Sequence, residues 1–512
     1  MLVNNFLEAS AEKFSSQKAV YFNDNWLTYS ELEIKANKLA NCLKDQGVKR
    51  GDRIALLSEN SFTNVIAYYS ILKCGGITVE LNTEITPADL NYLLNDCQAK
   101  GLILQEKYLN ILQKFDGEIS SIKFIVCDVN NNNKQECLKS TLSLESIFSE
   151  YDAHFEKPRV IDVDVASIIY TSGSTGKPKG VVLTHLNIVS NTKSIVKYLK
   201  LRSSDRIMVI LPFFYVYGKS LLNTHIFAGG SVVIDNRFAF PNAILKTMAE
   251  TECTGFAGVP STFHILLNKS AIRKRKFPHL RYVTQAGGAM APSIQQMVAT
   301  VIEPAKLFIM YGATEASARL SFLDPEILSK KWGSIGKAIP NVDLYIADEE
   351  GNPLGDGQVG EIVARGSNIM QGYWNDEEET RAVLINGSYF TGDLGKKDGE
   401  GFIYVVGRKK DMIKVGANRI SPKSIEEKLL ENPHVQEIAV IGVDDEVLGE
   451  AIKAFIVCNN SANHISINQL FEYCKKELPA FKVPKYIEFV EELPKNSSGK
   501  VLKQRLKTDY SV

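Results

Sequence analysis

The chain has 512 residues, too many for a single hydrophobic core, so its length indicates two or more domains. A hydrophobic content of 45% and a charged content of 23% are ordinary for a soluble globular protein. Lysine plus arginine and aspartate plus glutamate both number 59, so no overall field favours a nucleic acid or an anionic membrane. We therefore expect no nucleic-acid partner.

Signals for membranes, secretion and zinc are missing from the sequence. No apolar stretch approaches the ~18 residues of a membrane helix, so we expect no membrane span. The first residues, MLVNNFLEASAEKF, lack the basic and apolar regions of a signal peptide. The eight cysteines form no C-x-x-C pair, and the seven histidines are dispersed, which argues against a zinc site and favours reduced thiols. The expected location is the cytoplasm.

In chain order, helical and strand-like segments alternate through the first three hundred residues. Thr28 and Glu31 form a capping box that predicts the start of a helix. Strands are predicted at residues 53–57 and 77–81, with a helix at residues 62–73 between them. This alternation predicts an α/β fold of doubly wound layers.

The pattern changes after residue 340. Short alternating segments at residues 342–346, 361–364 and 402–406 predict a small β-rich subdomain. A charged run, RKKD, then precedes a compact α+β unit. The first helix of that unit is predicted to be capped by Ser421.

We place the domain boundary at this charged run. Residues 1–409 are expected to form a large N-terminal domain, and residues 410–512 a small C-terminal domain. No internal repeat is apparent in either part.

The segment from Tyr170 to Gly180, YTSGSTGKPKG, is rich in glycine, hydroxyl groups and lysine and follows a strand predicted at residues 165–169. Such a turn directs backbone N–H groups and side-chain donors at phosphate oxygens. It is not a Walker A loop, because Pro178 follows the lysine where serine or threonine is required. The candidate phosphate-binding residues are Thr171, Ser172, Gly173, Ser174, Thr175, Gly176, Lys177 and Lys179.

Two further segments have the chemistry of a nucleotide site. Residues 311–315, YGATE, follow a predicted strand; they offer an aromatic ring for a base and a Thr-Glu pair for a metal-bound phosphate. Residues 389–393, YFTGD, place a carboxylate at a glycine turn, where it can accept hydrogen bonds from both hydroxyls of a ribose.

Taken together, the three segments resemble the motifs of the adenylate-forming superfamily, which includes AMP-dependent acyl-CoA synthetases and ligases. The resemblance covers nearly the whole chain, with the motifs in family order. It implies that the enzyme activates a carboxylate with ATP and Mg²⁺. It also implies that the N-terminal domain binds ATP and the acyl group, while the C-terminal domain is a mobile lid.

The resemblance assigns roles to individual residues of the nucleotide site. Glu315 is expected to hold Mg²⁺ on ATP, Thr314 to contact the α-phosphate, and Tyr311 to lie against adenine beside Gly312. Asp393 and Arg408 match residues that contact the ribose. The glycine-rich segment that borders the adenine and acyl sites corresponds to Gly287, Gly288 and Ala289.

The resemblance also implies roles for three lysines near and beyond the domain boundary. Lys410 aligns with the residue at the hinge between the domains. Lys500, on a Gly/Ser loop near the C-terminus, matches the catalytic lysine that contacts both the carboxylate and ATP. Lys414 matches another active-site position, though more weakly.

The acid itself is less well defined. The predicted acyl pocket contains Tyr215, Tyr217, Gly218, Lys219 and Gly287. Tyr215 stands where the family often has histidine, so the gate to the carboxylate site is expected to differ. Lys219 could pair with a second charge on the substrate, but the commoner role of such a lysine is that of a solvated helix residue, which we favour. Fatty, aryl and amino acids all stay open.

The expected reaction has two steps. A carboxylate attacks the α-phosphate of ATP to give an acyl-adenylate and pyrophosphate, and a thiol then displaces AMP. Coenzyme A is the preferred acceptor, and the phosphopantetheine arm of an acyl or peptidyl carrier protein is the alternative. A nucleotide-binding protein without turnover is a second hypothesis, disfavoured because all the charged motif residues are present. The protein is expected to be a monomer or a homodimer.

Overall fold

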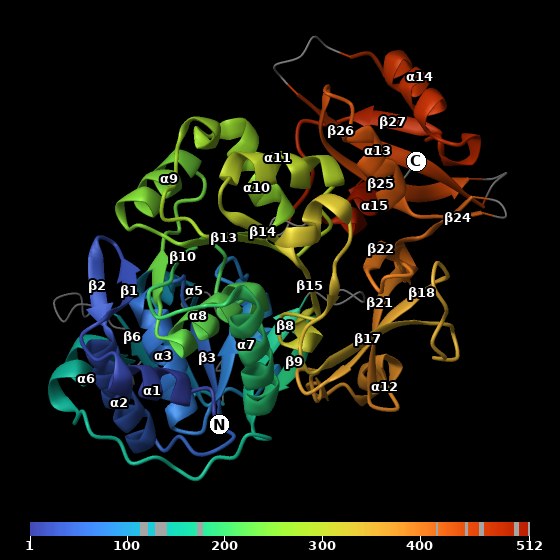
Figure 1. Ribbon diagram of the computed structural model, residues 1–512. Helices are drawn as coiled ribbons and strands as arrows, with labels where there is room; N and C mark the ends of the chain where they lie inside the picture. The colour runs from blue at the N-terminus through green and yellow to red at the C-terminus, as the bar shows by residue number, and fades with distance from the viewer. Residues whose placement is uncertain are drawn as a thin grey trace.

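The computed structural model describes most of the chain: residues 1–112, 121–128, 141–171, 178–415, 418–445, 449–459, 465–495 and 501–509. Within these ranges the chain forms two large sheets, a small antiparallel sheet and a C-terminal sheet (Figure 1). None of the helices in these ranges is both long enough and apolar enough to cross a membrane.

The first large sheet is mainly parallel and ends in two antiparallel strands. Its strand order is β19-β9-β8-β4-β3-β5-β6-β7. The hairpin between β8 and β9 is antiparallel and pairs Thr171 with Lys179. Its strands are β3 (Arg53–Leu57), β4 (Ile77–Glu80), β5 (Gly101–Leu104), β6 (Phe124–Cys127), β7 (Thr141–Ser143), β8 (Val165–Thr171), β9 (Lys179–Thr184) and β19 (Gly372–Tyr373).

The second large sheet has the order β16-β15-β14-β13-β12-β10-β11-β1-β2. Its central strands are parallel, and antiparallel strands close it at both edges. Its strands are β1 (Lys18–Phe22), β2 (Asn25–Thr28), β10 (Arg206–Val209), β11 (Ser231–Ile234), β12 (Gly255–Gly258), β13 (Tyr282–Gln285), β14 (Lys306–Tyr311), β15 (Ser321–Leu323) and β16 (Lys337–Ala338).

One hydrophobic core joins the two large sheets. It contains Ile54 of β3, Val232 of β11, Val65 of α3 and Leu222 of α8, so α3 and α8 pack between the sheets. Ten of the twelve residues of α3 are buried, which explains why this helix is apolar on nearly every side. The helices that contribute to this core are α1 (Asn5–Lys13), α2 (Tyr29–Asp45), α3 (Phe62–Lys73), α6 (Leu144–Glu150), α7 (His185–Leu199) and α8 (Val216–Ala228).

Further helices cover the outer faces of the two sheets. Leucines of α4 pack with β3 and β5 on the first sheet, and α9, α10 and α11 share a second core with β12 and β13. Their bounds are α4 (Pro87–Asp96), α5 (Leu109–Leu112), α9 (Pro241–Glu250), α10 (Pro260–Lys269) and α11 (Pro292–Ile302).

The small sheet is antiparallel and follows the second large sheet in sequence. It has the order β17-β18-β21-β20, with β22 paired to β21. The elements of this region are β17 (Val342–Ala347), β18 (Val359–Gly366), α12 (Glu377–Val383), β20 (Leu384–Ile385), β21 (Ser388–Lys397) and β22 (Ile403–Arg408).

The C-terminal unit is a mixed sheet with helices and has cores of its own. Figure 1 shows it beyond β22, on the same side of the molecule as α10 and α11. Lys423 donates from Nζ to the carbonyl of Val405 at 2.6 Å, which ties the unit to β22. Its elements are β23 (Ile413–Val415), β24 (Asn418–Ile420), α13 (Pro422–Leu429), β25 (Val435–Asp445), β26 (Gly449–Cys458), α14 (Ile467–Glu477), β27 (Tyr486–Phe489) and α15 (Lys503–Asp509).

The predicted fold class is confirmed, and so is the capping box of Thr28 and Glu31. One local prediction is wrong in its detail. Ser421 does precede α13, but its hydroxyl donates to the carbonyl of Val406 and makes no capping hydrogen bond to the helix. The boundary at Lys410 falls in a short 3-10 turn between β22 and β23, and stays a prediction.

Candidate active site

The predicted nucleotide segments gather where strands of the two large sheets end. Strands β10, β12, β13 and β14 run parallel, so the segments that follow them leave the second sheet at one edge. Ligands of open α/β sheets bind at this carboxyl edge. The segments at residues 210–215, 286–291 and 312–318 therefore all begin at the carboxyl edge of the second sheet.

The structure describes only the two ends of the YTSGSTGKPKG segment, residues 170–171 and residues 178–180. Thr171, the last residue of β8, donates from Oγ1 to the carbonyl of Lys179 at 3.4 Å, which closes the neck of the hairpin. The predicted phosphate ligands Ser172, Gly173, Ser174, Thr175, Gly176 and Lys177 lie outside the described residues.

Glu315 lies next to the neck of this loop. Tyr373 donates a hydrogen bond from its hydroxyl to Oε1 of Glu315 at 2.8 Å. Burial, followed by the charge of Glu315, raises the pKa of Tyr373, so the hydroxyl keeps its proton and remains a donor. The ammonium of Lys179 lies 5.5 Å from the centre of the Tyr373 ring and 2.5 Å from Oε2 of Glu379. One tyrosine thus connects the candidate metal ligand with a candidate phosphate ligand.

The donor set around Glu315 fits Mg²⁺ bound together with phosphates. Mg²⁺ usually takes one or two carboxylates, with water and substrate phosphate oxygens completing its coordination. No group of three acidic, histidine or cysteine side chains that could hold a metal occurs in the described ranges. A single carboxylate beside a phosphate loop therefore suits a metal that arrives with the nucleotide.

A second cluster surrounds Asp393 on β21. Tyr311, at the end of β14, donates from its hydroxyl to Oδ2 of Asp393 at 2.7 Å, and Arg408 donates from Nε to Oδ1 at 2.9 Å. Burial, followed by the charge of Asp393, raises the pKa of Tyr311 well above its ordinary value. Each carboxylate oxygen is oriented by one donor and retains lone pairs for a diol.

Glycine is required where the YGATE segment turns back on itself. A Cβ atom added to Gly312 would lie 1.9 Å from the carbonyl oxygen of Ala318. Residues 312–318 therefore form a tight loop that keeps Thr314 and Glu315 close to Tyr311. The described part of the chain gives no side-chain hydrogen bond for Thr314.

The glycine-rich segment after β13 begins at Gly287, whose φ of +83° belongs to the left-handed region. Gln285 donates from Nε2 to the carbonyl of Gly288 at 2.8 Å and holds the turn. Gly288 and Ala289 are exposed, and Pro260 of α10 lies across from Gly288. Their placement at the strand edge is compatible with contact to a nucleotide or an acyl group.

The segment that precedes α8 is packed tightly against that helix. A Cβ atom on Gly218 would lie 2.1 Å from the carbonyl oxygen of Pro212. Tyr215 is the residue before the helix, and its ring lies 4.5 Å from that of Phe214. Tyr217 is buried and forms a hydrogen bond with Oγ1 of Thr284 at 2.9 Å.

The prediction that Lys219 is solvated is wrong. Lys219 is only 5% exposed, and its Nζ lies 2.7 Å from Oε1 of Glu80, which is also 5% exposed. The ammonium also lies 4.0 Å from the centre of the Tyr68 ring and 4.9 Å from that of Phe213. The error has a non-local cause, because Glu80 and Tyr68 come from β4 and α3.

Burial acts on both members of this pair. It lowers the pKa of Lys219, an effect opposed by Glu80, and it raises the pKa of Glu80, an effect opposed by Lys219. Asn64 accepts a further hydrogen bond from the ammonium at 3.3 Å. Each charge therefore depends on the other, because removal of one would leave the other buried and unpaired.

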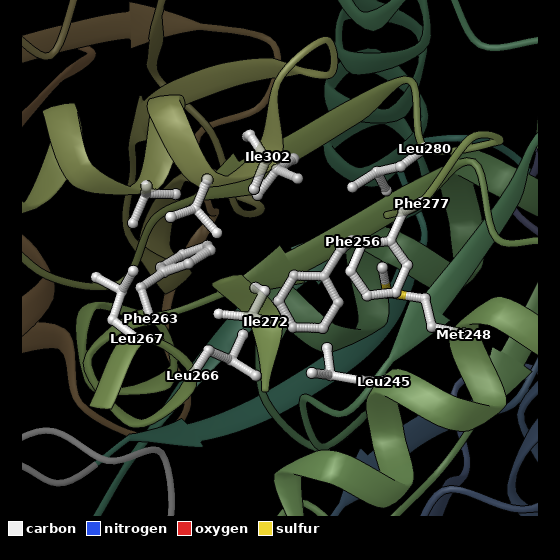
Figure 2. Close-up of a pocket in the computed structure, with 13 residues that line it drawn as sticks. Leu245, Met248, Phe256, Phe263, Leu266, Leu267, Ile272, Phe277, Leu280 and Ile302 are labelled. Atoms are coloured by element: carbon white, nitrogen blue, oxygen red, sulfur yellow. The ribbon is translucent and has the colours of Figure 1, made fainter. Parts of the chain in front are cut away.

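Two small cavities of the described ranges differ in character. The first is a small gap lined by thirteen apolar residues of the second core between α9, α10, α11, β12 and β13 (Figure 2). The second has room for about one water molecule and lies between α3, α7, α8, β8 and β9. Lys219, Asn223 and Ser317 are among its polar lining residues.

The three predicted lysines of the C-terminal part are placed differently. Lys410 is exposed in the turn between β22 and β23. Lys414 on β23 is exposed, and its backbone N–H donates to Oε2 of Glu450 at 2.6 Å. Lys500 lies outside the described residues.

Sequence reasoning missed several residues that complete the site. Tyr373 contacts Glu315, Glu80 pairs with Lys219, and Arg319 places its guanidinium 4.1 Å from the centre of the Tyr217 ring. The sequence signal for Tyr373 was the run of Gly372, Tyr373 and Trp374, which comes after the strand predicted at residues 361–364. A glutamate within the apolar strand β4 was the signal for the second.

Comparison with known proteins agrees with this geometry. The sequence model of the AMP-binding enzyme family matches residues 7–374, and that of the AMP-binding enzyme C-terminal domain matches residues 424–500. A long-chain-fatty-acid–CoA ligase of Bacillus subtilis (strain 168) is 33% identical over 534 residues, which cover 98% of this chain and 94% of that protein. A 2-succinylbenzoate–CoA ligase of Bacillus licheniformis is 31% identical over 507 residues, which cover 98% of this chain and 99% of that protein.

A solved structure extends the likeness to three dimensions. An anthranilate CoA ligase in complex with anthranoyl-AMP superimposes with a TM-score of 0.92 at 27% identity, covering 100% of this chain and 97% of the other. The family match spans more than half of the chain, and the sequence relatives match it from end to end. The chain therefore belongs to the AMP-binding enzyme family, the adenylate-forming superfamily that its motifs resemble.

Proposed function

We propose that this protein is an AMP-forming acid–CoA ligase. It activates a carboxylic acid with ATP to an acyl-adenylate, releases pyrophosphate, and transfers the acyl group to coenzyme A with release of AMP. The observation that carries the proposal is the convergence of two clusters on the YGATE segment. Glu315, Tyr373 and Lys179 gather at one end, and Tyr311, Asp393 and Arg408 gather at the other.

The two clusters suit the two ends of ATP. Asp393, oriented by Tyr311 and Arg408, accepts hydrogen bonds from the ribose hydroxyls. Glu315 would hold the magnesium ion, which would supply positive charge against the phosphates when bound. Lys179 and the hydroxyl-rich loop after Thr171 bind the phosphates that leave as pyrophosphate. The chain acts by charge stabilisation and positioning, with no covalent intermediate on a side chain.

The C-terminal part supplies the remaining positive charge. We assign to Lys500 the role of neutralising the carboxylate and the α-phosphate as they meet, on the basis of the family motif. Lys414 is a secondary candidate for the same role. Lys410 lies in the turn between β22 and the C-terminal sheet, a suitable place for a hinge that reorients this unit between the two steps.

The hinge assignment is tested by separating the two partial reactions. A Lys410→Pro variant is expected to keep acid-dependent ATP–pyrophosphate exchange and to lose most of its thioester formation. The proline fixes the φ angle at position 410, which hinders the reorientation needed for the second step. Equal loss of both reactions would refute the hinge role.

The acceptor and the assembly are further parts of the proposal. Coenzyme A is the acceptor we favour, because the relatives named above are CoA ligases. A holo carrier protein is the alternative, and acylation of each acceptor, followed by mass spectrometry, separates them. We propose a cytoplasmic monomer or homodimer, which light scattering of the purified protein resolves.

The names of the relatives leave the acid open. They include a fatty-acid, a succinylbenzoate and an anthranilate ligase, so they agree on the reaction and differ in the acid. The experiment that tests the function is ATP–pyrophosphate exchange over a panel of acids, with Lys500→Ala as the matched variant. Exchange that needs both an acid and Lys500 supports the proposal. Nucleotide binding without exchange for any acid would favour a non-catalytic protein.

A further inference from the structure

One buried cation of the chain differs from the others in having no carboxylate partner. The basic side chains that are buried in the ranges that the structure describes are Lys73, Lys219, Arg319 and Lys453. Each of the three lysines has a carboxylate oxygen at 2.7 Å or 3.0 Å from its ammonium. Arg319 is 2% exposed and forms no ion pair with an acidic residue of these ranges.

The contacts of the Arg319 guanidinium are all with neutral groups. Its Nε donates to the sulfur of Met310 at 3.3 Å, and its Nη1 donates to the carbonyl of Ala318 at 3.0 Å. Tyr198 is a third hydrogen-bond partner, and Cζ lies 4.1 Å from the centre of the Tyr217 ring. Arginine is seldom buried without an anion, so this environment leaves a positive charge uncompensated.

The guanidinium lies on the face of β14 opposite to the ribose cluster. Met310 and Tyr311 are consecutive residues of this strand, so their side chains point to opposite faces of the sheet. Tyr311 reaches Asp393, whereas Met310 reaches Arg319. Tyr217, a residue of the predicted acyl pocket, contacts the guanidinium from α8. The charge of Arg319 therefore lies beside the predicted acyl pocket and away from the predicted ribose contact.

The backbone of Arg319 is close to the YGATE segment. A Cβ atom added to Gly312 would lie 2.8 Å from Cα of Arg319, because the loop of residues 312–318 turns back on itself. Arg319 is also only four residues beyond Glu315, the candidate metal ligand. An acid that reacts near this segment therefore needs only a short chain to reach the guanidinium.

A carboxylate is the anion that best fits this position. The guanidinium presents paired N–H donors that match the two oxygens of a carboxylate, and its flat face packs on an aromatic ring at the same time. Lys219, on the same helix as Tyr217, is already neutralised by Glu80 and does not compete for that carboxylate. A purely apolar acid would leave the charge of Arg319 unpaired beside its chain.

We propose that Arg319 binds a second carboxylate of the substrate, which is then a short dicarboxylic acid. One carboxylate reacts with ATP, and the other pairs with the guanidinium beside Tyr217. The inference rests on the acid–CoA ligase function and on the assignment of Tyr217 to the acyl pocket. It names the substrate class of that site, with Arg319 as its specificity-determining residue.

The test is ATP–pyrophosphate exchange with acids matched in length: butanoate and succinate, hexanoate and adipate, benzoate and isophthalate, with palmitate as a long apolar acid. We expect kcat/KM for the best dicarboxylic acid to exceed that of its monocarboxylic match by at least about tenfold, the effect of one hydrogen-bonded charge. Arg319→Met should lower this ratio by about 10- to 100-fold. Arg319→Lys, which keeps the charge and loses the paired donors, should retain part of it.

Thermal unfolding separates a ligand contact from a purely structural role. Arg319→Met leaves no acidic residue of the described ranges unpaired, so it should destabilise the protein much less than Lys219→Met, which leaves Glu80 unpaired. The preferred dicarboxylic acid should raise the melting temperature of the unmodified protein and not that of Arg319→Met. Arg381→Met, which removes an exposed ion pair with Glu377, is the control and should leave the exchange ratio unchanged.

Three results would overturn the inference. One is a monocarboxylic acid, palmitate included, that is used as well as the best dicarboxylic acid. Another is an Arg319→Met variant that slows exchange with both kinds of acid by the same factor, which would make Arg319 a structural residue or a nucleotide contact. The third is a dicarboxylic preference that Arg319→Met and Arg319→Lys both leave unchanged. Exchange with none of the acids would instead count against the proposed function, so the two failures are distinguishable.

Discussion

The two ends of the active site use charge in different ways. At the predicted nucleotide end, Asp393 is buried but its partner Arg408 is accessible, with 42% of the arginine side chain exposed. At the predicted acyl end, Lys219 and Glu80 are almost fully buried and neutralise each other. A pair with one accessible member can exchange partners when a ligand arrives, whereas a fully buried pair is part of the packed core. The Asp393–Arg408 pair should therefore matter mainly for catalysis, and the Lys219–Glu80 pair mainly for stability and specificity.

The largest expected effect is on stability. Lys219→Met leaves the buried Glu80 unpaired and should lower the free energy of unfolding by about 3–5 kcal/mol. The double variant Lys219→Met/Glu80→Leu should recover much of this loss, because an apolar pair removes both charges. Urea denaturation followed by circular dichroism measures both.

Arg408→Met is the matched variant at the other end of the site. Its ion pair is partly solvated, so it should change the free energy of unfolding by less than about 1 kcal/mol. If Arg408→Met destabilises the protein as much as Lys219→Met, the distinction between the two ends is wrong.

The next effect concerns catalysis at the phosphate end. Glu315→Gln removes the candidate magnesium ligand and should slow pyrophosphate exchange about 100- to 1000-fold, the range for loss of one transition-state stabilising group. Glu326→Gln is the control, since Glu326 forms an exposed ion pair with Lys306. If Glu315→Gln and Glu326→Gln have comparable exchange rates, Glu315 is not a ligand of the magnesium ion.

A smaller effect is expected at the ribose. Asp393→Ala loses charged hydrogen bonds to the sugar, and such bonds contribute about 1.5–3 kcal/mol, which corresponds to a KM for ATP raised by roughly 10- to 100-fold. The KM for the acid should stay nearly constant. If only the KM for the acid rises, Asp393 belongs to the acyl part of the site and not to the ribose contact.

The smallest predicted effect tests the tyrosine that joins the two phosphate-end residues. Tyr373→Phe removes one hydrogen bond to Glu315, which at about 1 kcal/mol corresponds to a rate lowered roughly fivefold. The loss should be larger at low magnesium, because the hydroxyl orients the carboxylate. Activity that is insensitive to this change at every magnesium concentration would contradict the orienting role.

The clustering of the candidate nucleotide residues could be predicted from sequence because they occur in short contiguous segments. Tyr311 and Glu315 are four residues apart, and the strand before them fixes their direction. The α/β layers followed from alternating helical and strand-like periods, and the strands at residues 53–57 and the helix at residues 62–73 have the predicted bounds.

The acyl end could not be predicted in the same way. Whether Lys219 is solvated depends on Glu80 and Tyr68, which lie far away in the chain and reach it only after the two sheets close around α3 and α8. The same holds for Tyr373, whose partner Glu315 belongs to the other large sheet's edge. The helical spacing of α8 predicts which of its residues share a face, but it does not predict which residues of other elements pack against that face.

The most direct test of the account is product analysis of the complete reaction. The purified enzyme would be incubated with ATP, magnesium, coenzyme A and the best acid from the exchange panel, and its products resolved by phosphorus NMR and mass spectrometry. The account predicts AMP, pyrophosphate and an acyl-CoA in equal amounts, with acyl-AMP accumulating when coenzyme A is left out. Formation of ADP and phosphate, or a thioester made without AMP, would contradict it.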